Sequence, residues 1–158
     1  MRFFDPFVLM AAIALLSPVS AARADAKVTG MVTIDGACKK LTVGGESRTT
    51  DCKGILLNTE YSDQRTGFYF TTIDGLIVTF STRGDQEVRA DANTITAPVD
   101  MMIVSRKGQI DRIKAAGTCR FGDPFRGPTV IECVADSEGG RYEGTFLSNG
   151  QKPDLKTF

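Results

Sequence analysis

The chain carries no long stretch with a helical period: after position 24, its apolar residues come in short runs that end at glycine-containing turns. Turn dipeptides of this kind suit positive backbone φ angles and tight hairpins. They are Asp35-Gly36, Gly44-Gly45, Asp74-Gly75, Gly139-Gly140 and Asn149-Gly150. Only residues 85–92 and 109–116 tolerate a helix, and both are shorter than the roughly 12 to 15 residues that an isolated helix needs. A helical bundle and a doubly wound α/β fold are therefore excluded.

Alternation of apolar and polar residues predicts an all-β protein, folded as an antiparallel β-sandwich or a small β-barrel of about eight to ten strands. The expected strands are residues 28–34, 55–58, 68–72, 76–81, 93–97, 99–104, 129–135 and 141–147. The clearest hairpin joins the third and fourth of these strands. Its inward face would carry Phe68, Phe70, Leu76, Val78 and Phe80. A small helix and a bulged strand both fit residues 85–92 and 109–116. The tail, residues 151–158, is expected to be loose except where Phe158 docks.

The four cysteines form two pairs with the same spacing: Cys38 and Cys52 are fourteen positions apart, and so are Cys119 and Cys133. Three connectivities are possible. We expect Cys38 to bond Cys52 and Cys119 to bond Cys133, because neighbouring strands can bring together the ends of so short a loop. A four-cysteine zinc site or a redox-active pair would need a C-x-x-C pair, which the sequence lacks. The cysteines are therefore interpreted as structural disulfides, with no metal.

The residues that flank the cysteines are also similar in the two pairs. Cys38 and Cys119 each end a strand-like run and precede a basic residue, whereas Cys52 and Cys133 each follow an acidic one. Two similar halves, each with one disulfide, would explain these similarities, and so would chance in a glycine-rich chain.

Residues 1–24 have the layout of a secretory signal. Arg2 precedes ten apolar residues, 7–16, and a tract of small residues ends at Ala24. Cleavage there would release a single disulfide-stapled β-domain, residues 25–158; a competing site would release Lys27. Ten residues span about 15 Å as a helix, half of a bilayer core, so we expect no stable membrane span. A buried or amphipathic first helix is the alternative. The predicted location is periplasmic or secreted.

Charge and composition remove several classes of function. The chain has 19 basic and 19 acidic residues and no histidine. A nucleic-acid partner is not expected, because such proteins usually carry a basic excess. Catalytic triads and metal sites that use imidazole are excluded. An active site would depend on carboxylates, and the candidates are Asp85 with Glu87, Asp136 with Glu138, and Asp123. No cofactor motif is present.

The most distinctive segment is residues 117–128, which combines two phenylalanines and two arginines with glycines and prolines. A rigid aromatic loop with arginines is typical of a binding site. Residues 106–126 also hold six basic and two acidic side chains, which can attract an anionic partner. The candidate partner-binding residues are Arg112, Lys114, Arg120, Phe121, Phe125 and Arg126. Alternatively, both phenylalanines cap the core, and charges from other strands neutralise the arginines and lysines.

The leading hypothesis is a small exported β-domain that acts as a non-catalytic binding or accessory protein and needs no cofactor. Its partner would be a protein, a glycan or an anionic envelope component. Two alternatives stay open: a carboxylate-dependent enzyme acting on polysaccharide, and a carrier of an apolar ligand with a lipocalin-like dry interior.

Overall fold

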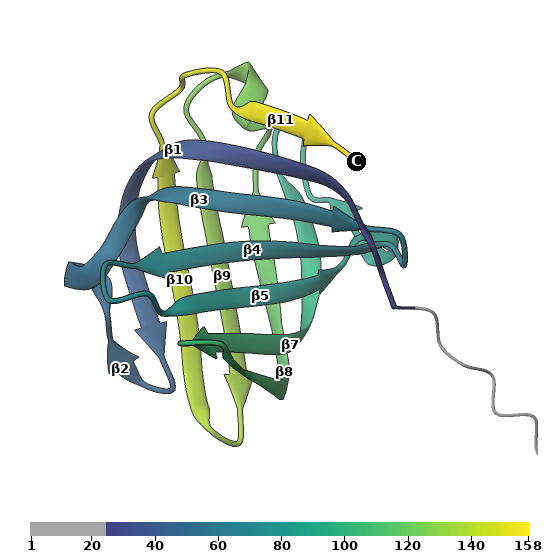
Figure 1. The fold of residues 1–158 in the computed structure, drawn as a ribbon. Coiled ribbons are helices and arrows are strands. Elements are labelled where there is room, and N and C mark those ends of the chain that lie inside the picture. The colour runs from purple at the N-terminus through teal and green to yellow at the C-terminus, as the bar shows by residue number, and fades with distance from the viewer. Residues whose placement is uncertain (1–24) are drawn as a thin grey trace, which may run out of the picture.

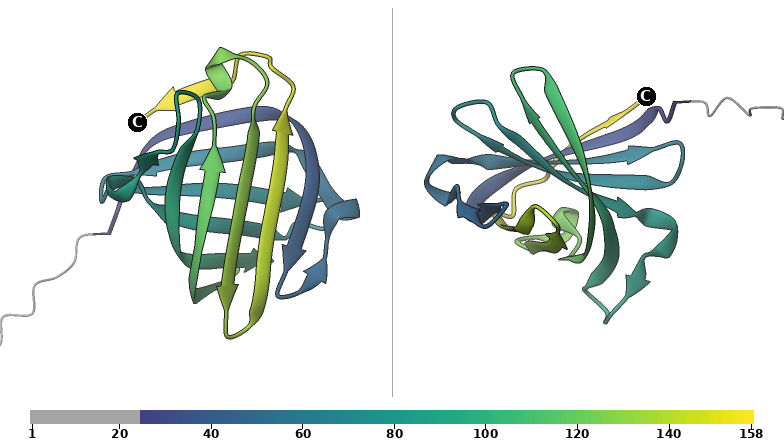
Figure 2. Two further views of the ribbon diagram at one scale, coloured as in Figure 1. Left: turned by 180° about the vertical axis from the view of Figure 1, so that it is seen from behind. Right: turned by 90° about the horizontal axis from the view of Figure 1, so that it is seen from below.

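In the computed structural model, which describes residues 25–158, eight strands close into an antiparallel barrel (Figure 1). In chain order they are β1 (Val28–Val43), β3 (Cys52–Tyr61), β4 (Arg65–Thr72), β5 (Ile77–Arg83), β7 (Ile95–Arg106), β8 (Gln109–Phe121), β9 (Val130–Ser137) and β10 (Gly140–Ser148). Each strand pairs with the next, and β10 pairs with the second half of β1, as Figure 2 shows from behind. The predicted all-β fold is confirmed, and the barrel is the correct one of the two architectures.

Short elements lie outside the barrel wall. The strands are β2 (Glu46–Ser47), β6 (Val88–Arg89) and β11 (Asp154–Thr157), and the single turns of 3₁₀ helix are η1 (Thr49–Asp51), η2 (Gly84–Gln86) and η3 (Pro124–Arg126). The ambiguous segment 85–92 thus holds part of η2 and the strand β6. Segment 109–116 is extended within β8, whose pairing with β7 shifts register opposite Ala115 and Ala116, so the bulged strand is correct there.

The core follows the period-two pattern of the sequence. The five residues predicted to face inward from the hairpin are all buried, and the rings of Phe70 and Phe80 meet edge to face with centroids 5.7 Å apart. Leu41, Met102 and Phe146, from β1, β7 and β10, fill the rest of the interior. These large side chains pack the middle of the barrel, as is usual for a barrel of eight strands.

Both disulfides have the predicted connectivity. Cys38–Cys52 joins β1 to the start of β3, with the Cα atoms 5.9 Å apart. Cys119–Cys133 joins facing residues of β8 and β9, with the Cα atoms 4.0 Å apart. The bonds do not occupy equivalent positions in two halves. The first bond joins the first and second strands of the barrel and the second bond joins the sixth and seventh, whereas two halves of four strands each would place the second bond between the fifth and sixth.

The tail is not loose, contrary to expectation. β10 covers only residues 36–42 of β1, which leaves backbone groups of Gly30–Thr33 free on that side, and β11 pairs with them. Pro153 is buried beside this strand, whereas Phe158 is 74% exposed and does not dock. Backbone pairing orders the tail. The low apolar content of these residues does not indicate this pairing in the sequence.

Candidate functional site

A pocket of about 620 Å³ opens at the end of the barrel where β3 meets β4 and β8 meets β9. Small-molecule sites in proteins usually have about 300 to 1,000 Å³. The pocket is lined by Val32, Ile34, Asn58, Glu60, Phe68, Arg89, Ala92, Asn93, Ile95, the segment 121–126, Pro128, Thr129 and Ile131. It therefore combines inward positions of the barrel wall with the loop between β8 and β9.

The floor of the pocket is apolar. Ile34, Phe68 and Ile131 are almost completely buried, because they occupy inward positions of β1, β4 and β9. The ring of Phe121, at the end of β8, leans on that of Phe68 with the centroids 5.0 Å apart. An apolar group in the pocket would rest on this surface and be removed from water.

The loop that covers the pocket is held by its own hydrogen bonds. Asp123 caps η3 by accepting a hydrogen bond from the Phe125 N–H at 2.9 Å, and its carboxylate lies 3.5 Å from the guanidinium of Arg126. The Thr129 N–H donates to the Ser148 hydroxyl at 2.8 Å, which ties the end of the loop to β10. Phe125 remains 43% exposed at the rim. Little conformational freedom remains to be lost when a ligand binds.

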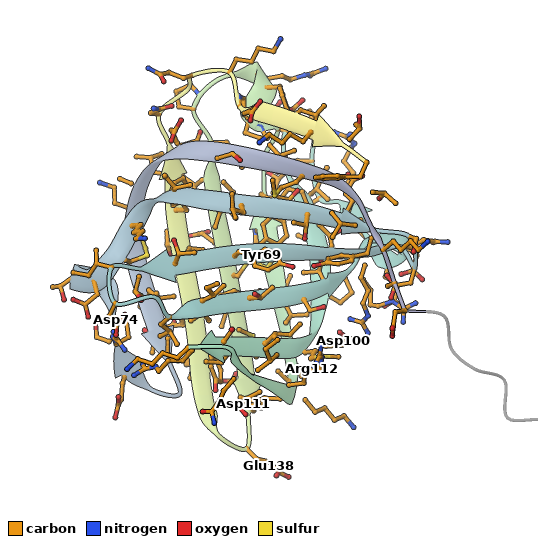
Figure 3. All side chains as sticks on the ribbon, viewed as in Figure 1. Tyr69, Asp74, Asp100, Asp111, Arg112 and Glu138 are labelled. Carbon is orange, nitrogen blue, oxygen red and sulfur yellow. A yellow bond between two sulfur atoms is a disulfide. The ribbon has the colours of Figure 1, made fainter. Side chains whose placement is uncertain are left out.

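Of the six predicted partner-binding residues, the structure brings three together at this pocket: Phe121, Phe125 and Arg126. The other three point outward from β8. Arg120 faces Glu132 across the β8–β9 ladder, and Arg112 and Lys114 lie toward the opposite end of the barrel, where Figure 3 labels Arg112. The basic residues thus form a stripe along one strand rather than a single patch.

Sequence reasoning missed the charged residues of the far wall, Glu60 and Arg89, and the polar Asn58. The signal for two of them was present, because Asn58 and Glu60 follow Leu56 at alternate positions. Leu56 is fully buried, so this parity points a polar group inward at the end of β3. Arg89 carries no such signal, since it belongs to the short strand β6.

Three of the carboxylates considered for catalysis have partners in the structure. Asp85 accepts two hydrogen bonds from Arg83, at 2.9 and 2.8 Å, and these hold the pKa of Asp85 below its usual value. Asp136 contacts Arg141 at 3.1 Å, and Asp123 caps η3. These contacts give each of the three aspartates a local structural role. The three aspartates therefore do not support the hypothesis of a carboxylate-dependent enzyme.

A second polar cluster lies on the outer face of β3 and β4, where the hydroxyls of Tyr61 and Tyr69 are hydrogen-bonded. Figure 3 labels Tyr69. The ring of Tyr69 lies over Gly67, in the space that a side chain would fill. Burial, more than the contact with Tyr61, raises the pKa of Tyr69 to about 12. At neutral pH the phenol is protonated, so it can donate a hydrogen bond but cannot act as a base.

This shift predicts a late alkaline transition. The pKa of Tyr69 is higher in the folded chain than its ordinary value of 10, so the stability it contributes is complete below pH 10 and lost as the pH rises toward 12. Absorbance at 295 nm should show one of the three tyrosines ionising with an apparent pKa near 12. Burial also raises the pKa of Tyr142, so Tyr69→Phe should reduce the late alkaline absorbance change by one tyrosine. An undiminished change in this variant would contradict the assignment.

Comparison of the chain with protein-family models, curated proteins and solved structures found no match. Among residues 25–158, no group of three or more Cys, Asp or Glu side chains is placed to hold a metal ion. No helix in that part of the chain is long and apolar enough to cross a membrane.

Proposed function

We propose that the chain is an exported, non-catalytic binding protein whose ligand site is the open end of the barrel. The observation that carries this proposal is the pocket itself: an apolar floor, polar walls and a covering loop fixed by hydrogen bonds, in a volume suited to a small molecule. The proposal combines the leading hypothesis from the sequence, a binding protein, with the carrier alternative.

The packing of the barrel interior supports a shallow site at one end of the barrel rather than a deep channel. Phe70, Phe80 and Phe146 fill the middle of the barrel, so a ligand would rest above them on Phe68, Phe121 and Ile131. Burial of apolar ligand surface contributes roughly 25 cal/mol per Å². The entropy of association offsets a part of this gain, and the walls of a closed barrel keep the further cost of ordering the site small.

The two disulfides support the proposed location, the periplasm or the extracellular space, because they fit an oxidising compartment. The predicted secretory signal, residues 1–24, lies outside the residues that the structure describes. The N-terminus of the protein purified from its own envelope fraction tests export directly.

Occupation of the pocket by a new side chain tests the site. Asn93 lines the pocket, and its hydrogen bond to Asp91 uses the backbone N–H, so Asn93→Trp keeps that bond and fills part of the mouth. We expect this variant to bind the fluorescent apolar probe N-phenyl-1-naphthylamine at least about tenfold more weakly than the unmodified chain.

The matched control is Thr50→Trp, an exposed position in η1 at the opposite end of the barrel, which should bind the probe like the unmodified chain. Equal melting temperatures would show that both variants fold. Unchanged probe binding by a folded Asn93→Trp variant would remove the pocket as the site.

A further inference from the structure

The charges at the mouth of the pocket restrict the chemistry of its ligand. Four charged side chains line it: Glu60, Arg89, Asp123 and Arg126. Asp123 and Arg126 neutralise each other at 3.5 Å. Within the described chain, neither Glu60 nor Arg89 forms an ion pair. Arg89 donates only to the carbonyl of Ala92, at 3.1 Å. One carboxylate and one guanidinium thus remain available to a ligand.

The carboxylate of Glu60 belongs to the pocket wall. Its Oε2 lies over Gly30 of β1, 3.6 Å from where a Cβ of that residue would be, so no side chain of β1 separates it from the pocket. Burial and the nearby charge of Glu60 together raise the pKa of Glu87. This side of the mouth would therefore attract a positive group.

A ligand with a single charge would pair with only one of the two free groups and place its apolar part beside the other. Because both side chains are exposed, a ligand that pairs with one of them gains less than a ligand that pairs with both. A purely apolar ligand would leave both groups unpaired at its edge. A molecule with one positive and one negative charge beside an apolar part satisfies both groups and also covers the floor.

Building on the proposed function, we infer that the pocket takes a zwitterionic amphiphile. Its cationic group would face Glu60, its anionic group would face Arg89, and its apolar part would rest on Phe68, Phe121 and Ile131. The apolar part is required, since the charged groups at the mouth are exposed to solvent and exposed ion pairs contribute little alone.

Four probes with the same eight-carbon chain and different head groups test this inference: octylphosphocholine, octanoate, octyltrimethylammonium and octyl glucoside. Each is titrated by calorimetry below the concentration at which it forms micelles. Octylphosphocholine should bind about tenfold more tightly than the other three. Free phosphocholine, which has the charges without the chain, should not bind measurably.

Two charge-removing variants should change the order of affinities in opposite directions. Glu60→Gln should lose about tenfold in affinity for octylphosphocholine and then favour octanoate over octyltrimethylammonium. Arg89→Gln should show a similar loss and the reverse preference. The matched controls, Glu138→Gln and Arg106→Gln, change exposed residues at the far end of the barrel, where Figure 3 labels Glu138. They should bind all four probes unchanged.

The outcomes separate this inference from the proposed function. Equal affinity for the four chain-bearing probes, with no effect of either charge variant, would contradict the inference of a zwitterionic ligand. The proposed apolar binding site would be unaffected by that result. Tight binding of octanoate or octyltrimethylammonium alone would overturn the inference in favour of a singly charged ligand. If none of the probes binds and Asn93→Trp leaves N-phenyl-1-naphthylamine binding unchanged, both proposals fail.

Discussion

Replacement of all four cysteines by alanine is expected to lower the free energy of unfolding by about 6 kcal/mol. Each bond joins residues 14 positions apart, and closing a loop of this size stabilises a folded chain by about 3 kcal/mol through the entropy of the unfolded state. Domains of ordinary stability have about 5 to 15 kcal/mol in total. The variant should therefore be close to unfolded at 37 °C. Urea unfolding followed by circular dichroism measures the change.

Variants that lack one bond each serve as controls, and their effects should differ. Cys119 and Cys133 are fully buried between β8 and β9, so alanines there also leave a cavity, whereas Cys38 and Cys52 are only partly buried. The Cys119→Ala/Cys133→Ala variant should thus lose more stability. Limited reduction of the native chain should open Cys38–Cys52 first, because a reductant reaches it more easily. If alkylation and mass mapping find Cys119 and Cys133 labelled first, the burial argument is wrong.

The disulfides could be predicted because they depend on local order along the chain. Fourteen positions leave room for a strand, a turn and the start of the next strand, so each pair lies on neighbouring strands. The hairpin face with Phe70 and Phe80 could be predicted for the same reason, since alternation within one strand determines which side chains point together.

Closure of the barrel could not be distinguished from a sandwich, because it depends on pairing between the two ends of the chain. β10 meets β1 over residues 36–42, about a hundred positions away in sequence, and no local pattern encodes that contact. The order of the tail has the same origin. β11 forms because β10 leaves part of β1 unpaired, which is a property of the closed barrel.

The residues of the candidate site also fall into those that a local sequence pattern predicts and those that it does not. Phe121, Phe125 and Arg126 were found because one short segment with unusual composition carries them all. Glu60 and Arg89 come from strands that are far from this segment in sequence, and they reach the pocket only through the register of the barrel. Arg112 and Lys114 were grouped with the segment by sequence proximity, but an extended β8 carries them to the opposite end of the barrel.

A second large loss of stability is expected from a side chain at Gly36, where β1 bends. At Gly36 the strand passes from pairing with β3 to pairing with β10, and the two backbones approach so closely that a Cβ would overlap the carbonyl oxygen of Leu147. The same Cβ would lie 2.9 Å from the ring of Phe146, which is fully buried. Neither neighbour can move without opening the ladder that closes the barrel.

We therefore expect Gly36→Ala to lower the free energy of unfolding by about 3 kcal/mol, the upper part of the range for overpacked cores. Gly30→Ala is the matched control, because it lies in the same strand and its Cβ would be in ordinary contact with Glu60 at 3.6 Å. Its stability should stay within about 0.5 kcal/mol of the unmodified chain. Urea midpoints of the three proteins give the comparison. A Gly36→Ala variant as stable as Gly30→Ala would show that β1 and β10 do not meet at this distance, and the closed barrel would then need a different register at its seam.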